Sequence, residues 1–486
     1  MVLMTVKHTT SQAPSAPEDT KASPIIHVIG LGVTESGQFS DEARTALLTA
    51  DLVIGSERQL NIIQPVLSHA RKNTPCPDHA ALNAGAQHSP HHNTDAIDVH
   101  TTQTHADTQT AQAAKPQQRL LPKLSTLKEM INTSGAEQVV ILASGDPLYY
   151  GIGRWLSQQF SAERLRFYPA ISSIQAACHS IGLSLQDAKV ISLHGRPVLS
   201  LRRHLAQQQY LVVLTDQHST PPALAALCEE AGFAESQLWV CERLGYQNQL
   251  VRKFSVSALC DKSVTSPDTR FDPLHVTIIK VIGQSRYLPS FPGIADQHFI
   301  TNNEAGRGLI TKREVRLAVL SLLQPAPADI GWDIGAGCGG VAVEWALWNP
   351  LGHVYAIEHH ATRFNCLAQN QQRFGVAENL NPINGRAPGI LATLPAANKI
   401  FIGGSDGELP SLLATLWENL PPQGVIVTSA VMETSKASLI QFAESLPKSA
   451  TETLQIGINK GGELAGHLLY RPSLPVTLFK FTKHQQ

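Results

Sequence analysis

One glycine-rich segment of the sequence has residue types and spacing that suit the binding of a nucleoside. Residues 332–340 read WDIGAGCGG, follow an apolar run and precede a helical pattern. Glycines at 335, 337 and 339 let the backbone turn sharply and approach a ligand closely. The free N–H groups at the start of the following helix can bind a carboxylate or a phosphate. Glu358, at the end of the next apolar run, can accept both hydrogen bonds of a ribose diol.

The glycines alone do not identify the nucleoside. Gly335, Gly337 and Gly340 also satisfy the GxGxxG pattern of dinucleotide-binding loops, so NAD and S-adenosylmethionine are both candidates. Asp333 favours S-adenosylmethionine, because a carboxylate suits a cationic amino-acid group and repels a pyrophosphate. A tight strand-to-helix turn without a ligand is the simpler alternative, and the combination of strand, loop, helix and distal acid argues against it.

A second cluster of polar residues lies upstream, in residues 309–315 (LITKREV). Apolar residues downstream predict a helix here, and Thr311 with Glu314 fits a capping box, which explains both residues structurally. Lys312 and Arg313 would then lie on the first turn, where the helix dipole disfavours cations. Their placement indicates an anionic partner, and a solvated surface explains them about equally well.

The elements that position such loops fall into two blocks, about 24–282 and 298–483. Both alternate short β-branched runs with helical patterns, which is typical of α/β folds with largely parallel sheets. The strands predicted in the first block are 25–29, 52–54, 139–143, 211–215 and 276–281. The strands predicted in the second block are 331–334, 353–357, 399–402 and 425–429.

Three segments outside these elements look irregular. Residues 1–23 are polar and predict a disordered tail, and 283–297 contain prolines and glycines typical of an interdomain linker. Residues 68–118, inside the first block, contain seven of the 20 histidines. Metal binding by that tract is possible in principle. Without fixed spacing or acidic partners, a flexible surface insertion is the better interpretation.

Composition excludes several classes of protein. The 486 residues include 38 basic and 39 acidic side chains, and this net charge of -1 argues against a nucleic-acid or membrane-surface binder. The seven cysteines are scattered without a CxxC pair, so neither a disulfide scaffold nor a cysteine-based metal site is expected. No apolar run approaches ~20 residues and the first residues lack a secretory core, so a cytoplasmic enzyme is predicted.

The second block resembles a known family through motifs in a fixed order. They are TKREV at 311–315, WDIGAG at 332–337, YAIE at 355–358 and IGG at 402–404. This series is similar to the precorrin methyltransferase/decarboxylase family of cobalamin synthesis, which implies a Rossmann-like class I methyltransferase fold. The resemblance implies that the cofactor, S-adenosyl-L-methionine, is bound by Thr311, Asp333, Gly335, Ala336, Gly337, Cys338, Gly339, Glu358, Arg386, Ala387 and Gly403.

One motif of the second block departs from that family. The usual Gly-Asp-Ala-Pro is here GRAP at 385–388, so Arg386 replaces the acid that would approach the adenine amino group. Adenine recognition at this place must then rely on the backbone. Alternatively, Arg386 has another task, such as holding a carboxylate of the substrate.

The first block contains four loops that are individually ordinary turns. They are VIGLGVT at 28–34, ASGDPLYYG at 143–151, YPAISS at 168–173 and LHGR at 193–196. Together they resemble the tetrapyrrole methylase family, especially its precorrin-6Y branch, although Val33 stands where the wider family usually has proline. The resemblance implies two α/β lobes with S-adenosylmethionine in the cleft between them. The residues implied to line it are Gly30, Gly32, Gly145, Asp146, Ser172 and Ser173.

The order of the blocks matches a fusion of these two families. This resemblance implies methylation of precorrin-6B at carbons 5 and 15 with decarboxylation of a ring acetate, giving precorrin-8X. Methyl transfer to an electron-rich carbon needs mainly positioning and desolvation, so no catalytic dyad is required. His194 and Tyr149 are possible proton donors, although each is more easily explained as structural. Arginine and lysine should hold the substrate carboxylates, and the candidates are Arg154, Arg196, Lys312, Arg313 and Arg386.

Three other functions are weighed against this one. An NAD-dependent oxidoreductase would use the same glycine loop, but Asp333 and the lack of a hydride-transfer partner argue against it. A non-catalytic tetrapyrrole or metal carrier would depend on the histidine tract. A nucleic-acid methyltransferase would need basic and aromatic patches that the sequence lacks. The expected partners are therefore a precorrin substrate and other copies of the chain in a homo-oligomer, with no nucleic acid, no membrane and no metal.

Overall fold

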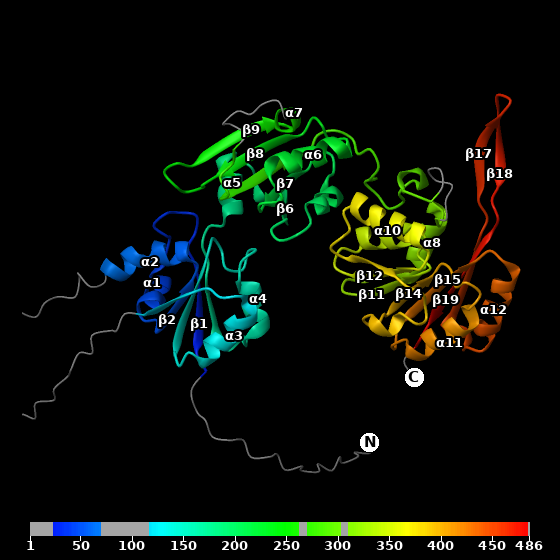
Figure 1. Cartoon of the computed structure of the whole chain (residues 1–486), viewed down its shortest axis with the longest axis horizontal. Coiled ribbons are helices and arrows are strands. Elements are labelled where there is room, and N and C mark those ends of the chain that lie inside the picture. The colour runs from blue at the N-terminus through cyan, green and yellow to red at the C-terminus, as the bar shows by residue number, and fades with distance from the viewer. Residues whose placement is uncertain (1–22, 70–115, 262–269, 303–309, 485–486) are drawn as a thin grey trace, which may run out of the picture. The chain divides into compact units, whose positions relative to one another are not determined.

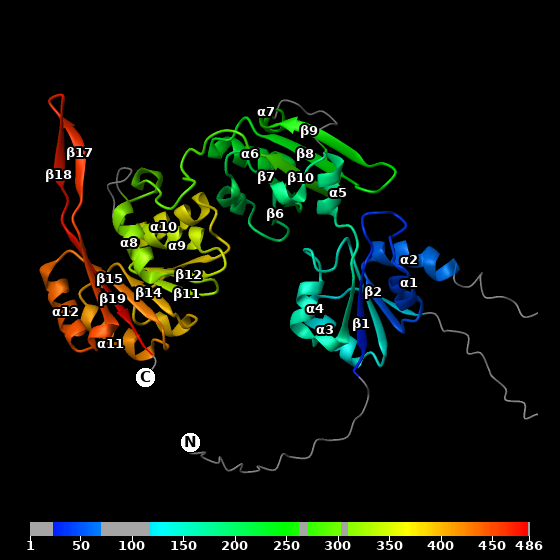
Figure 2. The same cartoon turned by 180° about the vertical axis from the view of Figure 1, so that it is seen from behind.

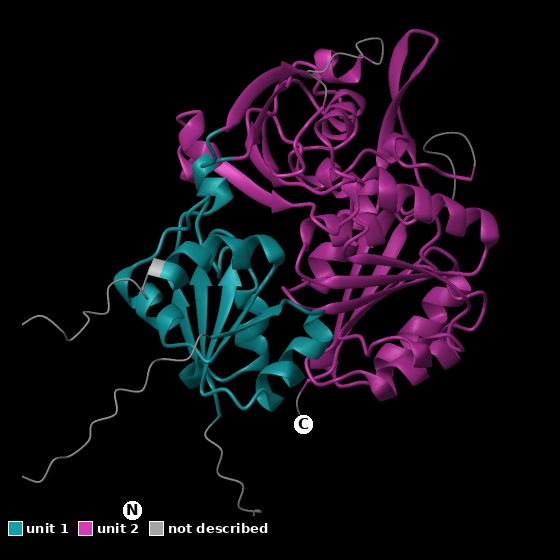
Figure 3. Cartoon of the chain, turned by 60° about the vertical axis from the view of Figure 1, so that its left-hand side comes forward, with its two compact units in different colours: residues 1–176, 244–247 teal, residues 177–243, 248–486 magenta. Residues whose placement is uncertain are grey.

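The computed structural model describes residues 23–69, 116–261, 270–302 and 310–484 (Figure 1, and from behind in Figure 2). The predicted tail and nearly all of the histidine-rich segment lie outside these residues. The chain forms two compact units (Figure 3): unit 1 is 1–176 with 244–247, and unit 2 is 177–243 with 248–486. None of the described helices is long and apolar enough to cross a membrane.

Unit 1 contains a parallel sheet in the order β3-β2-β4-β1-β5. Its strands are β1 (Ile25–Gly30), β2 (Leu52–Gly55), β3 (Gln117–Leu120), β4 (Gln138–Ala143) and β5 (Leu165–Tyr168). One face packs on α1 (Asp41–Leu48) and α2 (Glu57–His69), and the other on α3 (Leu124–Thr133) and α4 (Gly153–Gln159) (Figure 1). Because parallel strands end at one edge, the loops after β1 and β4 lie side by side.

The amino-terminal part of unit 2 contains a sheet in the order β6-β7-β10-β8-β9. Its elements are β6 (Ala188–Ser192), a 3-10 segment η3 (Val198–His204), β7 (Tyr210–Leu214), α6 (Pro221–Ala231), β8 (Gln237–Glu242), β9 (Leu250–Ser255), α7 (Val256–Cys260) and β10 (His275–Lys280). The helix α5 (Ser173–Ser180) runs from unit 1 into unit 2. Only β6 and β7 pair in parallel, so the expectation of largely parallel sheets is wrong here. The cause is that a short connection joins β8 to β9 as an antiparallel pair, and β10 lies antiparallel between β7 and β8.

The carboxyl-terminal part of unit 2 contains a seven-stranded sheet in the order β13-β12-β11-β14-β15-β19-β16. Its strands are β11 (Ile330–Ile334), β12 (His353–Glu358), β13 (Leu380–Asn384), β14 (Lys399–Ile402), β15 (Val425–Ala430), β16 (Thr451–Ile456) and β19 (Val476–Thr482). The helices α8 (Arg313–Leu323), α9 (Gly340–Trp348) and α10 (Ala361–Arg373) cover one face, and α11 (Leu409–Asn419) and α12 (Glu433–Glu444) cover the other. The strands β17 (Asn459–Leu464) and β18 (His467–Pro472) form a separate ribbon (Figure 2).

The start of α8 differs from the sequence prediction. Lys312 caps the helix with its backbone, without a side-chain hydrogen bond, so the capping box of Thr311 and Glu314 is not formed. The fully buried Arg316 guanidinium instead bonds the Thr311 carbonyl oxygen at 2.6 Å and the Glu344 carboxylate at 3.1 Å. Glu344 also accepts the amides of 293 and 294, so the end of the predicted linker packs against α8 and α9.

Candidate functional site

Three loops of unit 1 that contain predicted site residues meet at the carboxyl ends of β1 and β4. The Gly145 amide donates to the Gly32 carbonyl at 3.3 Å. A Cβ added to Gly30 would lie 2.5 Å from the Gly145 oxygen and 3.0 Å from the Ala170 Cβ, and one on Gly145 would lie 3.1 Å from the Ser172 Cα. Glycine is therefore required at 30 and 145 by the close approach of the three loops.

The predicted polar residues of these loops support local structure. The Asp146 carboxylate accepts the amides of Leu148, at 2.8 Å, and of the following residue. Ser172 and Gln175 form a reciprocal capping box at the start of α5, where Ser173 is the first helical residue. These hydrogen bonds confirm that Asp146 stabilises a turn and that Ser172 caps a helix. Binding of the methyl donor by the same residues stays a prediction.

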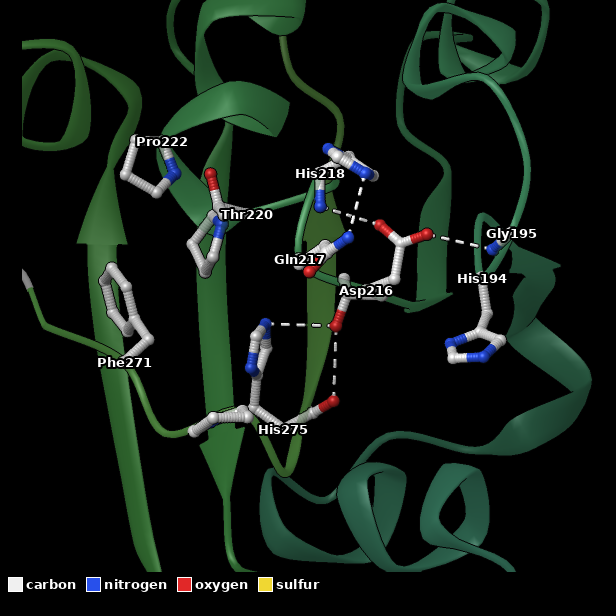
Figure 4. Close-up of a pocket in the computed structure, with 12 residues that line it drawn as sticks. His194, Gly195, Asp216, Gln217, His218, Thr220, Pro222, Phe271 and His275 are labelled. Carbon is white, nitrogen blue, oxygen red and sulfur yellow. Dashed lines mark hydrogen bonds between the residues drawn. The ribbon is translucent and has the colours of Figure 1, made fainter.

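Unit 2 has a hollow of about 820 Å³ between the ends of β6 and β7 and the start of β10 (Figure 4). Of the predicted site residues, only His194 lines it, and its ring is exposed. Gly195 belongs to the LHGR motif, and the other lining residues were not found from the sequence: Thr215, Asp216, Gln217, His218, Thr220, Pro221, Pro222, Phe271, Pro273 and His275. The signal available for them was a polar run, 215–220, directly after a buried strand, where α/β sheets place ligands.

Asp216 joins two of the loops around this hollow. Its carboxylate accepts the Gly195 amide at 2.8 Å and the His218 amide at 2.9 Å (Figure 4). It also accepts the Ser219 amide at 3.0 Å. These backbone hydrogen bonds, that of Gly195 first, hold the pKa of the Asp216 carboxyl well below its usual value. An ionised Asp216 therefore fixes the loop of His194 against the loop that begins α6.

The carboxyl-terminal part of unit 2 has a pocket of about 380 Å³ at the carboxyl ends of β11, β12 and β14. Eight predicted site residues line it: Thr311, Gly335, Ala336, Gly337, Glu358, Arg386, Ala387 and Gly403. Three charged lining residues were missed, namely His359, Arg363 and Asp406. His359 directly follows the YAIE motif, Asp406 lies two residues after the IGG motif, and Arg363 lies on the first turn of α10. Their closeness to these motifs was the sequence signal for them.

The glycine loop and the acid of this pocket contact each other. The Glu358 carboxylate is buried and accepts the Gly337 amide at 2.9 Å and the His360 amide at 2.8 Å. The Arg363 guanidinium lies 3.8 Å from it. A Cβ on Gly335, whose φ is +69°, would lie 2.6 Å from the Gly404 oxygen. The loop can thus follow the end of the sheet this closely only with glycine at 335.

Three residues of the predicted donor set do not line the pocket. The Asp333 side chain is 1% exposed, and burial raises the pKa of its carboxyl to about 7; the nearby Ala342 amide lowers it and Glu358 raises it. Cys338 is fully buried, and Gly339 caps α9 with Leu367 packed over it. These residues support the strand-to-helix turn from behind. Contact of Asp333 with a cationic amino-acid group stays a prediction.

The predicted carboxylate-binding cations belong to both units of the chain. Four form ion pairs in unit 2: Arg196 with Glu378, Lys312 with Asp296, Arg313 with Glu314, and Arg386 with Glu408. Arg386 also lines the pocket at β11, β12 and β14. Arg154 lies in unit 1 and is exposed. Of the proton-donor candidates, Tyr149 belongs to unit 1 and His194 to unit 2, and both roles stay predictions.

Similarity to known proteins covers both halves of the chain. The family model of tetrapyrrole (corrin/porphyrin) methylases matches residues 26–260, and that of the precorrin methyltransferase domain matches 304–483. A precorrin-6Y C(5,15)-methyltransferase (decarboxylating) of Sinorhizobium sp. is 31% identical over 476 residues, 96% of this chain and 99% of its own. The chain belongs to this family. The resemblances in the two blocks and the α/β fold class are thereby confirmed.

A second full-length relative agrees with this assignment, and a solved domain is also similar to part of the chain. A Mycobacterium tuberculosis protein of the same name is 30% identical over 94% of this chain and 100% of its own. A solved carboxyl-terminal domain of the Rhodobacter capsulatus member is 30% identical over 40% of this chain and all of its own, with a TM-score of 0.37. Family membership makes the chain a decarboxylating C-methyltransferase. It does not favour the dinucleotide-dependent oxidoreductase or the non-catalytic carrier.

Proposed function

We propose that the chain methylates precorrin-6B at carbons 5 and 15 and removes carbon dioxide from a ring acetate, giving precorrin-8X in cobalamin biosynthesis. Residues 24–282 would methylate carbon 5, and 298–483 would methylate carbon 15 and decarboxylate. The methyl donor would be S-adenosyl-L-methionine in both. The observation that carries the proposal is that glycine loops meet at the carboxyl edge of two different sheets in one chain of this family.

The pocket at β11, β12 and β14 fits a nucleoside sulfonium. The Gly335 turn leaves room for close approach of a ligand. The Glu358 carboxylate lines the pocket and has lone pairs left to accept hydrogen bonds from a ribose diol. The acids Glu358 and Asp406 are balanced in the pocket lining by Arg363 and Arg386, so the acceptor position of Glu358, and not net charge, is what favours a nucleoside diol here. When bound, S-adenosylmethionine supplies an electrophilic methyl group on a positively charged sulfur.

The residues of the chain act on this reaction mainly by positioning. The meso carbons of a reduced tetrapyrrole are electron-rich, so the protein has to hold the reacting atoms ~3–3.5 Å apart and exclude water. Arg386, between the donor pocket and solvent, is suited to hold a substrate carboxylate in place of its present partner Glu408. The conjugated macrocycle can accept the electrons left by decarboxylation once it is protonated.

Mass spectrometry of precorrin-6B incubated with the full chain and labelled methyl donor tests the function. The expected product has two labelled methyl groups and lacks one carbon dioxide. Thermal unfolding gives an independent check, because a ligand at 100 times its dissociation constant adds ~2.7 kcal/mol of stability. Protection by NADH and none by S-adenosylhomocysteine, together with no methyl transfer, would refute the proposal.

The assembly and location of the chain belong to the same proposal. We expect a homo-oligomer in the cytoplasm, acting on a free precorrin. The ribbon of β17 and β18 supports self-association, because Leu464, Leu468 and Tyr470 are each more than half exposed on it. Light scattering that finds only monomers at micromolar concentration would exclude the oligomer.

A further inference from the structure

Three large apolar side chains are exposed where the unit 1 loops meet. Leu148 is 54% exposed and Tyr150 is 50% exposed on the loop after β4, and Ile171 is 41% exposed on the loop before α5. The two loops are in contact, because the Gly145 backbone packs on Ser172. Large apolar side chains gathered at the ligand-binding edge of a sheet indicate a surface that a ligand or partner covers.

Tyr150 is held in a backbone conformation that tyrosine rarely adopts. Its φ is +58°, in the left-handed region, and its ring stacks edge-on against Tyr149 with 5.3 Å between centroids. The loop around it is locked: the Gly153 amide donates to the Pro147 oxygen at 2.8 Å, and a Cβ on Gly151 would lie 2.4 Å from that oxygen. Such strain costs ~1–3 kcal/mol and is characteristic of functional sites. A glycine would avoid this strain, so the strain is the cost of placing a large aromatic side chain at this position.

Two guanidinium groups flank this apolar surface. Arg154 is exposed on the first turn of α4, directly after the loop, where the helix dipole disfavours a cation without an anionic partner. On the other side, Arg58 donates to the Ser144 hydroxyl at 2.8 Å and to the Tyr246 hydroxyl at 3.1 Å. The acids Glu35 and Glu57 share a hollow with Arg58, which makes Arg154 the stronger anion site.

We infer that Leu148, Tyr150 and Ile171 form a platform for the flat face of the precorrin macrocycle, with Arg154 binding one of its carboxylates. A macrocycle with an apolar face and carboxylates at its rim matches an apolar surface bordered by guanidinium groups. The inference rests on the proposed function and names the substrate-positioning residues for carbon 5. The competing occupant is another part of this chain, which the experiment below distinguishes.

The decisive variant is Tyr150→Gly in the full chain. It removes the ring and relieves the left-handed strain, so thermal stability should stay the same or rise. The KM for precorrin in carbon-5 methylation should rise roughly 10-fold, as expected for loss of one large apolar contact, while kcat stays within about threefold. Tyr150→Phe should restore the wild-type KM. ¹³C NMR of the labelled product separates the methyl groups at carbons 5 and 15.

The matched control is Gln208→Gly, which relieves the same left-handed strain at an exposed turn of unit 2 with φ +59°. It should leave both methylations unchanged. Ile171→Ser and Leu148→Ser, at exposed positions, should raise the same KM without loss of stability. An unchanged KM in Tyr150→Gly would overturn the platform, as would equal loss of stability and of both methylations, which would assign the surface to packing within the chain. No methyl transfer by the unaltered chain would instead refute the proposed function.

Discussion

The two methyl-transfer halves build their sites in different ways. In the carboxyl-terminal half, one sheet supplies the glycine loop, the acid and the pocket, and eight predicted residues line one cavity. In the amino-terminal half, the glycine loops belong to unit 1, whereas the hollow with Asp216 and His275 belongs to unit 2. A site on one sheet depends on one backbone turn. The residues of the amino-terminal half lie on several loops, each fixed by its own hydrogen bonds, and we call this set the distributed site.

The largest expected effect is that of a single methyl group on the compact site. Gly335→Ala would put a Cβ 2.6 Å from the Gly404 oxygen, at a residue with φ +69°. Carbon-15 methylation and decarboxylation should fall at least 100-fold, which is about 2.7 kcal/mol, while carbon-5 methylation persists. Gly466→Ala, with φ +80° and open space around it, is the control for backbone strain. Loss of both methylations would mean that the two halves are not separate sites.

The corresponding change in the distributed site should have a smaller effect. Gly30→Ala would put a Cβ 2.5 Å from the Gly145 oxygen, and three loops have to shift together. Carbon-5 methylation should fall about 30-fold, or about 2 kcal/mol, with carbon-15 methylation unchanged. Gly135→Ala, in open space of the same unit, should leave both reactions intact. A fall in carbon-15 methylation would contradict the assignment of this half.

The fold was accessible from the sequence wherever one segment contained the whole signal. The nine strands predicted from β-branched runs occur within one residue of their bounds, for example Lys399–Ile402. Strands with polar or mixed sequences, such as Gln117–Leu120 and Asn459–Leu464, were missed because pairing with a neighbour, and not local composition, makes them strands. The antiparallel order around β10 was missed for the same reason.

The candidate site shows the same limit at the level of single residues. Glu358 and Gly335 could be placed on the pocket because a contiguous motif fixes where they lie. Asp333 belongs to the same motif, but the strand alternates sides, and its side chain is buried away from the pocket wall. Asp216 and Phe271 line a hollow formed by loops 55 residues apart, which no local pattern could indicate.

The role of Asp333 can be tested through the pH dependence of stability. Its folded pKa of about 7 is raised above the ordinary value of 3.8 by burial. The folded state therefore keeps a proton that the unfolded state releases, and stability is lost as pH rises from about 4 to about 7. Asp333→Asn should be more stable than the unaltered chain by about 2 kcal/mol at pH 8, with the difference vanishing near pH 4. Chemical denaturation at both values measures it.

A second measurement on this variant separates fold from binding. If Asp333 only supports the turn, the dissociation constant of S-adenosylhomocysteine in Asp333→Asn should stay within about threefold at pH 8. A rise of more than tenfold would show that the ionised carboxylate interacts with the cationic amino-acid group after all. The pocket would then extend behind the glycine loop. The compact site would resemble the distributed one in depending on residues that do not line its pocket.

The smallest expected effect concerns the hydrogen bonds by which Asp216 joins two loops of the distributed site. Asn at 216 can accept the Gly195 amide or the amides that begin α6, but its NH₂ group faces a donor on the other side. Asp216→Asn should raise the KM for carbon-5 methylation about fivefold, roughly 1 kcal/mol, because His194 and Gly195 lose their fixed position. Asp51→Asn is the matched control, since Asp51 also accepts two backbone amides, at 2.9 Å each, but before β2 at the opposite edge of a sheet. If both variants lose similar stability and only Asp216→Asn changes the KM, the Asp216–Gly195 hydrogen bond serves carbon-5 methylation. If the KM values of the two variants are equal, this hollow does not contribute to carbon-5 methylation, and the residues responsible are those on the loops of unit 1.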